Sequence, residues 1–324
     1  MRRSPVALAL VAVALTAAAC GGSGKSSSSS DTTGTEVSAS GNGNAAGILS
    51  AIDTKAVTGP QKLKLDLTVD IKGSPTDAQL AVFTKKPIHV GLDGVVDATG
   101  KSGDVNVSVA LGDTPVEAEL RYGAGKSWIQ IDGKWYDLPA DALSSTTGQS
   151  LPTGTSMSSV DAGKILAAIG DPSKLLENAS VSSEKVEGID SDKVSGDVNM
   201  AGVANAAASL SQSMGDSGSK APTQAEIDKV VKQLNDVVKT AHVDLWVGKD
   251  DHKVHRLAFA VDAAMDAATQ KSSGIESLTL NFDVTTVDAE APDASAPPSV
   301  GTPAEFQTAL IGLLGKVMGG AAAG

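Results

Sequence analysis

Two glycine-lysine-serine runs could bind phosphate if the rest of a phosphate-binding loop surrounded them. GSGKS ends at Ser26 and GAGKS ends at Ser127. Such a loop needs another glycine five residues before the last one, so that backbone N–H groups can surround the phosphate. Ala19 and Leu120 occupy those positions. The second run also lies between two strand patterns rather than before a helix, so neither run predicts a nucleotide site.

One further run is similar to the motif of a nucleophilic serine. GDSGSK spans residues 215–220, but Ser219 stands where that motif has its second glycine. A nucleophilic serine needs a histidine base that a carboxylate orients. Nothing around His89, the only histidine before this run, is typical of a protease. The composition of the run instead predicts a flexible linker.

The histidine and acidic residues offer no metal-binding pattern. His252 and His255 are three residues apart in a strand or turn context, where alternation directs them to opposite faces. The sequence has no HExxH motif, and the paired acids Asp250 and Asp251 fit a solvated turn. We therefore expect no metal, no cofactor and no enzymatic activity.

The single cysteine follows an apolar run near the N-terminus. Arg2 and Arg3 precede an apolar stretch over residues 6–15, and three alanines lead to Cys20. This order is typical of an export signal, and the apolar run is too short to remain across a bilayer. Cys20 has no disulfide partner in the chain, so it is either a free thiol, exposed to oxidation outside the cell, or a modified residue.

Cys20 resembles the lipobox cysteine of bacterial lipoproteins, although Ala17 stands where leucine is commoner. The resemblance implies a signal peptide over residues 1–19, a diacylglyceryl group on Cys20 and acylation of the new N-terminus by a chain such as palmitate. Two or three acyl chains make a stable anchor, whereas one is marginal. We expect attachment to the extracytoplasmic face of the cell membrane. Ordinary cleavage that leaves Cys20 unmodified is the alternative.

Composition divides the rest of the chain and excludes one class of partner. Residues 20–44 are rich in Ser and Gly and predict a flexible tether. Residues 45–290 predict a folded domain, and residues 291–324 predict a Pro/Ala linker and a C-terminal helix. The net charge of −12 would repel a phosphate backbone, so we expect no nucleic acid. Aromatic residues make up only 3%, so the core must be mainly Val, Leu, Ile and Ala.

Apolar and polar residues alternate along many segments of the domain. In KLKLDLTVDIKG, residues 62–73, every apolar side chain points one way and the charged ones point the other. KSWIQIDGKWYDL predicts a hairpin across Asp132 and Gly133. The same period of two recurs over residues 78–82, 88–92, 105–111, 116–122, 181–186, 193–200, 243–247, 257–261 and 278–284. Roughly ten such strands predict one large antiparallel sheet.

Helices are predicted at both ends and in the middle of the domain. The strongest, residues 223–241, begins with a capping box of Thr223 and Glu226. We expect it to cover the apolar face of the sheet. Others are expected over residues 45–57, 162–169, 173–178 and, more weakly, 202–214. A last helix is capped by the residues from Thr302 to Glu305 and carries Phe306, Leu310, Leu313, Leu314 and Val317.

Three segments together carry a resemblance to a known family. They are GKSWIQIDGKWYDLP, KILAAIGDPSKLLENASVSSEKVEGIDSDKVSGDVN and HVDLWVGKDDHKVHRLAF. With the cysteine and the tether, they resemble the LppX/LprG-type lipoproteins of mycobacteria and other actinobacteria, which share a LolA/LolB-like fold. The resemblance covers about residues 45–290. It implies an α+β fold in which a large curved antiparallel β-sheet, a half-barrel, wraps over a few α-helices.

The resemblance also implies a function. Proteins of this family bind an acylated lipid, glycolipid or lipoglycan in an apolar cavity between sheet and helices and move it within the cell envelope, with an envelope transport protein as a further partner. The expected ligand-binding residues are Leu63, Leu65, Leu67, Val69, Ile71, Val90, Leu92, Val107, Val109, Leu120, Ile227, Val231, Leu234 and Val238. The alternative is a non-catalytic surface lipoprotein that docks onto a partner protein or envelope complex.

Overall fold

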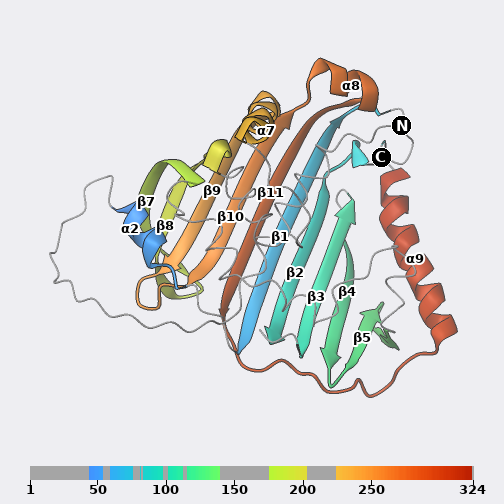
Figure 1. Ribbon diagram of the computed structural model, residues 1–324. Coiled ribbons are helices and arrows are strands. Elements are labelled where there is room, and N and C mark those ends of the chain that lie inside the picture. The colour runs from blue at the N-terminus through green and yellow to red at the C-terminus, as the bar shows by residue number, and fades with distance from the viewer. Residues whose placement is uncertain are drawn as a thin grey trace. The chain divides into compact units, whose positions relative to one another are not determined.

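A computed structural model describes residues 44–53, 59–75, 81, 83–97, 101–111, 115–138, 175–202 and 224–322. Its strands form one eleven-stranded sheet in the order β6-β5-β4-β3-β2-β1-β11-β10-β9-β8-β7 (Figure 1). The predicted α+β class with a large antiparallel sheet is confirmed. The strands are β1 (Pro60–Gly73), β2 (Ile88–Asp97), β3 (Gly103–Leu111), β4 (Pro115–Gly123), β5 (Lys126–Ile131), β6 (Lys134–Asp137), β7 (Leu176–Val186), β8 (Ile189–Val198), β9 (Val238–Gly248), β10 (Val254–Ala264) and β11 (Ile275–Asp288).

Strand β1 lies in the middle of the sheet because it pairs with β2 and with the last strand, β11. In this register Leu65 lies opposite Leu92 of β2 and Val284 of β11. Residues opposite one another on antiparallel strands share a face of the sheet, so the apolar positions of the three strands join into one surface. The alternation of apolar residues in β1 is therefore continued on both neighbouring strands, β2 and β11.

Tight turns with left-handed backbone conformations connect β4 to β5 and β5 to β6. Asp132 and Gly133, between β5 and β6, have φ values of 50° and 77°, which confirms the predicted hairpin turn. The GAGKS run is the turn between β4 and β5, with φ values of 51° at Ala124 and 76° at Gly125. The run therefore joins two strands and does not open a helix.

The described chain divides into two compact units. One contains α2 (Ala45–Ala51), β7, β8, α7 (Gln224–Val237) as far as Asn235, and residues 242–257. The other contains β1 to β6, residues 236–241, residues 258–264 of β10, α8 (Ala267–Ser273), β11 and α9 (Pro303–Ala322). In the first unit α2 contacts β7 and β8, and in the second α8 contacts β11 while α9 contacts β3 to β6.

Three helix predictions are wrong in their boundaries. The helix predicted over residues 223–241 ends at Val237, and Val238 begins β9. Valine and threonine are common from Val237 to Val243, and they favour a strand where a neighbouring strand is available for pairing. The helix predicted over residues 173–178 is wrong at residues 176–178, which begin β7. The N-terminal helix ends at Ala51, earlier than predicted.

Other predictions meet the structure only in part. The strand predicted over residues 78–82 is contradicted at Ala81, which is helical, and its other positions lie outside the described residues. The helix over residues 162–169, the run at 215–220 and Thr223 of the capping box also lie outside them, as does most of the helix at 202–214. Helix α8 was missed, although Asp266 caps it by accepting a hydrogen bond from the Thr269 N–H at 2.7 Å.

Candidate functional site

The structure places ten of the fourteen predicted ligand-binding residues on one face of four adjacent strands. Leu67 lies opposite Val90, Leu92 opposite Val107, and Val90 opposite Val109. Leu120 of β4 lies opposite Val105 and so continues the same face. We call this apolar surface, which the register continues onto β11 on one side and onto β5 and β6 on the other, the aliphatic face. Its predicted members are Leu63, Leu65, Leu67, Val69, Ile71, Val90, Leu92, Val107, Val109 and Leu120.

All ten of these side chains are half-buried. Each keeps part of its apolar surface exposed, whereas their neighbours on the same face of β11, Leu280, Phe282 and Val284, are 5% to 8% exposed. Burying an aliphatic side chain lowers the free energy roughly in proportion to the apolar area that is removed from water. The aliphatic face therefore has apolar area left that another apolar group could cover.

Sequence reasoning missed several residues of this face. Val105, Ala118 and Ile129 belong to it by register, as do the apolar residues of β11. Alternation over residues 278–284 did predict a strand, but nothing local in the sequence shows that this strand pairs with β1. The pairing joins residues more than two hundred positions apart, such as Leu67 and Phe282.

The other four predicted residues do not belong to the described aliphatic face. Ile227, Val231 and Leu234 lie on α7, in the unit that contains β7 and β8, and all three are half-buried. Val238 was predicted as a helical position, which is wrong, because it is the first residue of β9. A contribution of these four side chains to ligand binding stays a prediction.

Helix α9 packs on the same face of the sheet, at the end formed by β3 to β6. Ile129 and Ile131 lie opposite Leu120 and Ala118, which assigns them to the aliphatic face. Phe306 of α9 packs with Ile131 and Tyr136 in a buried cluster, which Ile129, Leu138, Ala309, Leu310 and Leu313 surround. On this part of the sheet the apolar surface is covered by α9, whereas the cover expected from the helix at residues 223–241 stays a prediction.

The first turn of α9 is held by polar contacts. The Thr302 N–H donates to Glu305 Oε2 at 2.8 Å, and Glu305 Oε1 accepts from Lys134 Nζ of β6 at 2.6 Å. The Lys134 ammonium, together with the hydrogen bonds from Thr302, lowers the pKa of Glu305 to about 2. Thr302 and Glu305 thus form the capping box expected at the start of this helix.

Stability should fall in acid because of this contact. A carboxylate whose pKa is lower in the folded state adds stability above its unfolded pKa, near 4.5, and loses it as the pH falls toward about 2. We expect Glu305→Gln to lower the urea midpoint at pH 7 and to flatten its decline between pH 4.5 and pH 2.5. Lys134→Gln should remove most of the same pH dependence. Parallel pH profiles for wild type and Glu305→Gln would contradict the assignment.

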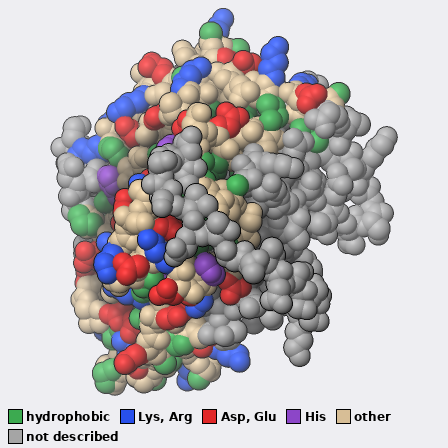
Figure 2. All heavy atoms as spheres, turned by 90° about the vertical axis from the view of Figure 1, so that its left-hand side faces the viewer, with side chains coloured by type: hydrophobic (Ala, Val, Ile, Leu, Met, Phe, Trp, Pro, Cys, Tyr) green, Lys and Arg blue, Asp and Glu red, His purple; other side chains and the backbone are tan. Residues whose placement is uncertain are grey.

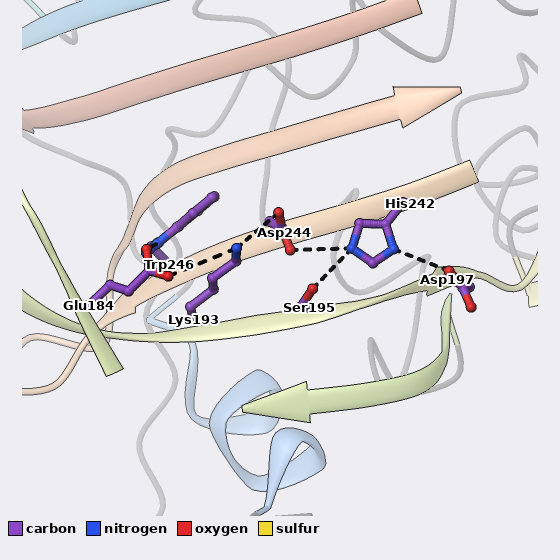
Figure 3. A network of polar contacts seen from close by, with 7 residues as sticks. All are labelled: Glu184, Lys193, Ser195, Asp197, His242, Asp244 and Trp246. Atoms are coloured by element: carbon purple, nitrogen blue, oxygen red, sulfur yellow. Dashed lines mark hydrogen bonds and ion pairs between the residues drawn. The ribbon is translucent and has the colours of Figure 1, made fainter. Parts of the chain in front are cut away.

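A second cluster of functional groups lies on β7, β8 and β9 (Figure 3). His242 Nε2 is 3.0 Å from Ser195 Oγ, and His242 Nδ1 is 3.1 Å from Asp197 Oδ1. These are the contacts of a serine, a histidine base and an orienting carboxylate. A second carboxylate, Asp244 Oδ1, lies 3.4 Å from the same Nε2.

The described residues around this cluster do not supply an oxyanion hole, which acyl transfer also needs. Ser195 is paired with Ser180 of β7 and with Asp244 of β9, so the backbone around it is engaged on both sides of β8. An oxyanion hole needs N–H groups directed at the substrate. His242 and Asp197 are also 45% and 58% exposed, so water reaches the imidazole. The arrangement fits a polar network on an exposed sheet surface.

Charge pairing in this network explains the pKa directions of its acids. Hydrogen bonds from Asn178 and His242 lower the pKa of Asp197. Burial raises the pKa of Asp244, but hydrogen bonds from Ser195 and Lys193 and the charge of Lys193 outweigh it and lower that pKa overall. Lys193 also lies 4.8 Å from the ring centre of Trp246, whose Nε1–H donates to Glu184 at 2.8 Å.

The described residues contain no group of three or more His, Cys, Asp and Glu side chains that could hold a metal ion. His252 lies in a turn with φ of 55°, and His255 is buried in β10 with Nε2 3.0 Å from Asp251 Oδ2. Figure 2 shows basic and acidic side chains interspersed over the described part of one face of the molecule. The described residues of that face form no patch of a single charge.

The described helices include none that is long and apolar enough to span a membrane. Cys20, the predicted point of lipid attachment, lies outside the described residues. Lipidation at Cys20 therefore stays a prediction. The same holds for the predicted ends of the signal peptide at residue 19, the tether at residue 44 and the folded domain at residue 290.

Comparison with known proteins returns no matching family model and no matching curated relative. Solved structures do match. The lipoprotein LppX of Mycobacterium tuberculosis is 13% identical, with a TM-score of 0.28 over 69% of this chain and 84% of LppX. LprF of Mycobacterium bovis is 14% identical, with a TM-score of 0.32 over 76% of this chain and 90% of LprF. LppX is one of the two proteins after which the family that the sequence resembles is named, and this chain is similar to its structure over most of both chains. Such TM-scores carry no argument about ligand or activity.

Proposed function

We propose that this protein is a lipid-anchored lipoprotein of the cell envelope that binds an acylated lipid or glycolipid on the aliphatic face and carries it between sites in the envelope. The observation that supports the proposal is the state of that face. Ten aliphatic side chains from four adjacent strands share one surface, and all of them retain exposed apolar area. No chemical step and no cofactor form part of the proposal.

The physical need for such a carrier follows from the cost of exposing acyl chains to water. Each methylene costs about 0.8 kcal/mol, so a two-chain lipid in water costs on the order of 20 kcal/mol. A carrier must offer surface about as apolar as the bilayer so that exchange is nearly neutral. Valine, leucine and isoleucine side chains meet that need, and they impose few directional contacts on a disordered acyl chain.

Binding can be tested directly on protein expressed without residues 1–20. The purified protein is extracted with organic solvent, the extract is analysed by mass spectrometry, and the delipidated protein is titrated with a fluorescent fatty acid analogue. We expect co-purified acylated lipid and saturable uptake of the analogue. Repeated absence of both would overturn the proposed function.

A matched pair of substitutions on β1 tests where the lipid binds. Leu65 and Lys64 are adjacent, but Leu65 lies on the aliphatic face between Leu92 and Val284, whereas Lys64 lies on the opposite face. Leu65→Asn removes an apolar contact and introduces an amide that the lipid cannot hydrogen-bond. This substitution should weaken binding of the analogue by about tenfold. Lys64→Gln should leave it unchanged. Equal affinities for the two variants would contradict this location.

A further inference from the structure

Helix α9 covers part of the surface that the proposed lipid would use. Leu120 is one of the predicted ligand-binding residues, and it lies opposite Ile129 on the aliphatic face. Ile129 lies opposite Tyr136, whose ring centre is 5.8 Å from that of Phe306 in α9. The covered end of the face, over β3 to β6, is therefore continuous with its half-buried part on β1 and β2.

The contacts that hold α9 differ along its length. At its start, the Gly301 N–H donates to the Trp135 carbonyl at 2.8 Å, and the ion pair of Lys134 with Glu305 follows. A Cβ on Gly301 would lie 2.7 Å from the Tyr136 ring, so the chain passes close to β6 here. Among the described side chains after Phe306, those that pack on the cluster are Ala309, Leu310 and Leu313, and all three are apolar.

This distribution makes one end of the helix hard to displace and the other end easy. Parting the first turn would break hydrogen bonds and an ion pair. Parting Leu310 and Leu313 from the cluster of Ile131, Tyr136 and Phe306 would break apolar contacts, because both side chains are aliphatic. An acyl chain that takes their place restores the same kind of contact, because dispersion and burial do not depend on the direction of approach.

We propose that α9 is an intramolecular competitor of the lipid: in the ligand-free protein its Leu310 and Leu313 occupy the β3–β6 end of the aliphatic face, and an entering acyl chain displaces them while the first turn stays attached. This inference rests on the proposed function. It predicts that the apparent affinity for lipid equals the intrinsic affinity multiplied by the fraction of molecules in which this end of the face is uncovered.

Two residues of α9 give a matched pair of variants. Leu313 packs against the sheet cluster, whereas Ile311, two positions earlier, is 71% exposed. Weakening the cover should raise the uncovered fraction, so Leu313→Ala should bind the fluorescent fatty acid analogue about fivefold more tightly than wild type. Ile311→Ala should bind as wild type does.

The sign of the effect separates this inference from a static role for the helix. If α9 were a fixed wall of the site, Leu313→Ala would remove a lipid contact and weaken binding. If the helix only supported the fold, affinity would not change. Either result overturns the inference while leaving the proposed function standing. Absence of binding in wild type and both variants would overturn the proposed function itself.

Hydrogen exchange of the unmodified sequence provides a second test that does not depend on a variant. We expect the amides of residues 309–313 to exchange at least tenfold faster when the fatty acid analogue is bound, because that part of α9 has left the sheet. The Gly301 N–H, which is bonded to the Trp135 carbonyl, should keep its protection. Unchanged or slower exchange of residues 309–313 on binding would overturn the inference.

Discussion

Replacing Cys20 with alanine is expected to move the protein from the membrane fraction to the soluble fraction of a bacterium that processes lipoproteins. The thiol is the only group in the chain that can receive a diacylglyceryl group by thioether formation, since the sequence contains no other cysteine. Each buried methylene of an acyl chain adds about 0.8 kcal/mol to membrane binding, and two or more chains make the anchor stable. Removing the attachment point should therefore change the distribution almost completely.

A nearby substitution controls for effects on export. Ser23 lies three residues after the cysteine, in the predicted tether. Its replacement, Ser23→Ala, should leave the protein in the membrane fraction. Metabolic labelling with a radioactive or clickable fatty acid should mark wild type and Ser23→Ala but not Cys20→Ala. If Cys20→Ala remained with the membranes, anchoring would have to come from another apolar segment, and the C-terminal helix would be the first to test.

Ile131→Ala should cause a large loss of stability in the unit that contains α9. Ile131 is 1% exposed and packs with Tyr136 and Phe306 in the cluster that joins α9 to the sheet. Truncating a fully buried isoleucine to alanine costs about 2–5 kcal/mol, because apolar contacts are lost and a cavity is left. Urea unfolding followed by far-ultraviolet circular dichroism should show a midpoint lowered accordingly.

The same chemical change at Ile311 provides the control. Its side chain is 71% exposed, so Ile311→Ala should change the free energy of unfolding by no more than about 0.5 kcal/mol. The difference between the two isoleucines measures how tightly α9 packs on the sheet. A loss below about 1 kcal/mol for Ile131→Ala would show that this cluster is not a packed core.

Strands and turns could be predicted from the sequence because their signals are local. The strict alternation of residues 62–73 follows from the period of two in a pleated strand, and it predicts β1 without knowledge of any partner. Asp132 and Gly133 tolerate positive φ, which is what a two-residue hairpin needs. Thr302 and Glu305 lie three residues apart and form the capping box that begins α9. Each signal lies within a few residues of the structure that it predicts.

The candidate sites could be predicted only in part. Ten aliphatic residues were assigned correctly to one face, because each strand showed which of its residues point the same way. The network of Ser195, Asp197 and His242 could not be found, because it depends on the register between β8 and β9. The end of α7 at Val237 was also missed, since pairing in the sheet, rather than helical propensity, determines the structure of the residues that follow.

The sequence by itself determined the α+β composition of the chain, the apolar face of each strand and the identity of Cys20 as the one thiol that can carry a lipid. Tertiary structure alone decided that β1 pairs with β11, that α9 packs over β3 to β6, and that the aliphatic face keeps exposed area on β1 and β2. The physical reason is the range of the interactions. Backbone geometry acts between adjacent residues, whereas strand register and helix packing depend on the total area that distant segments bury against one another.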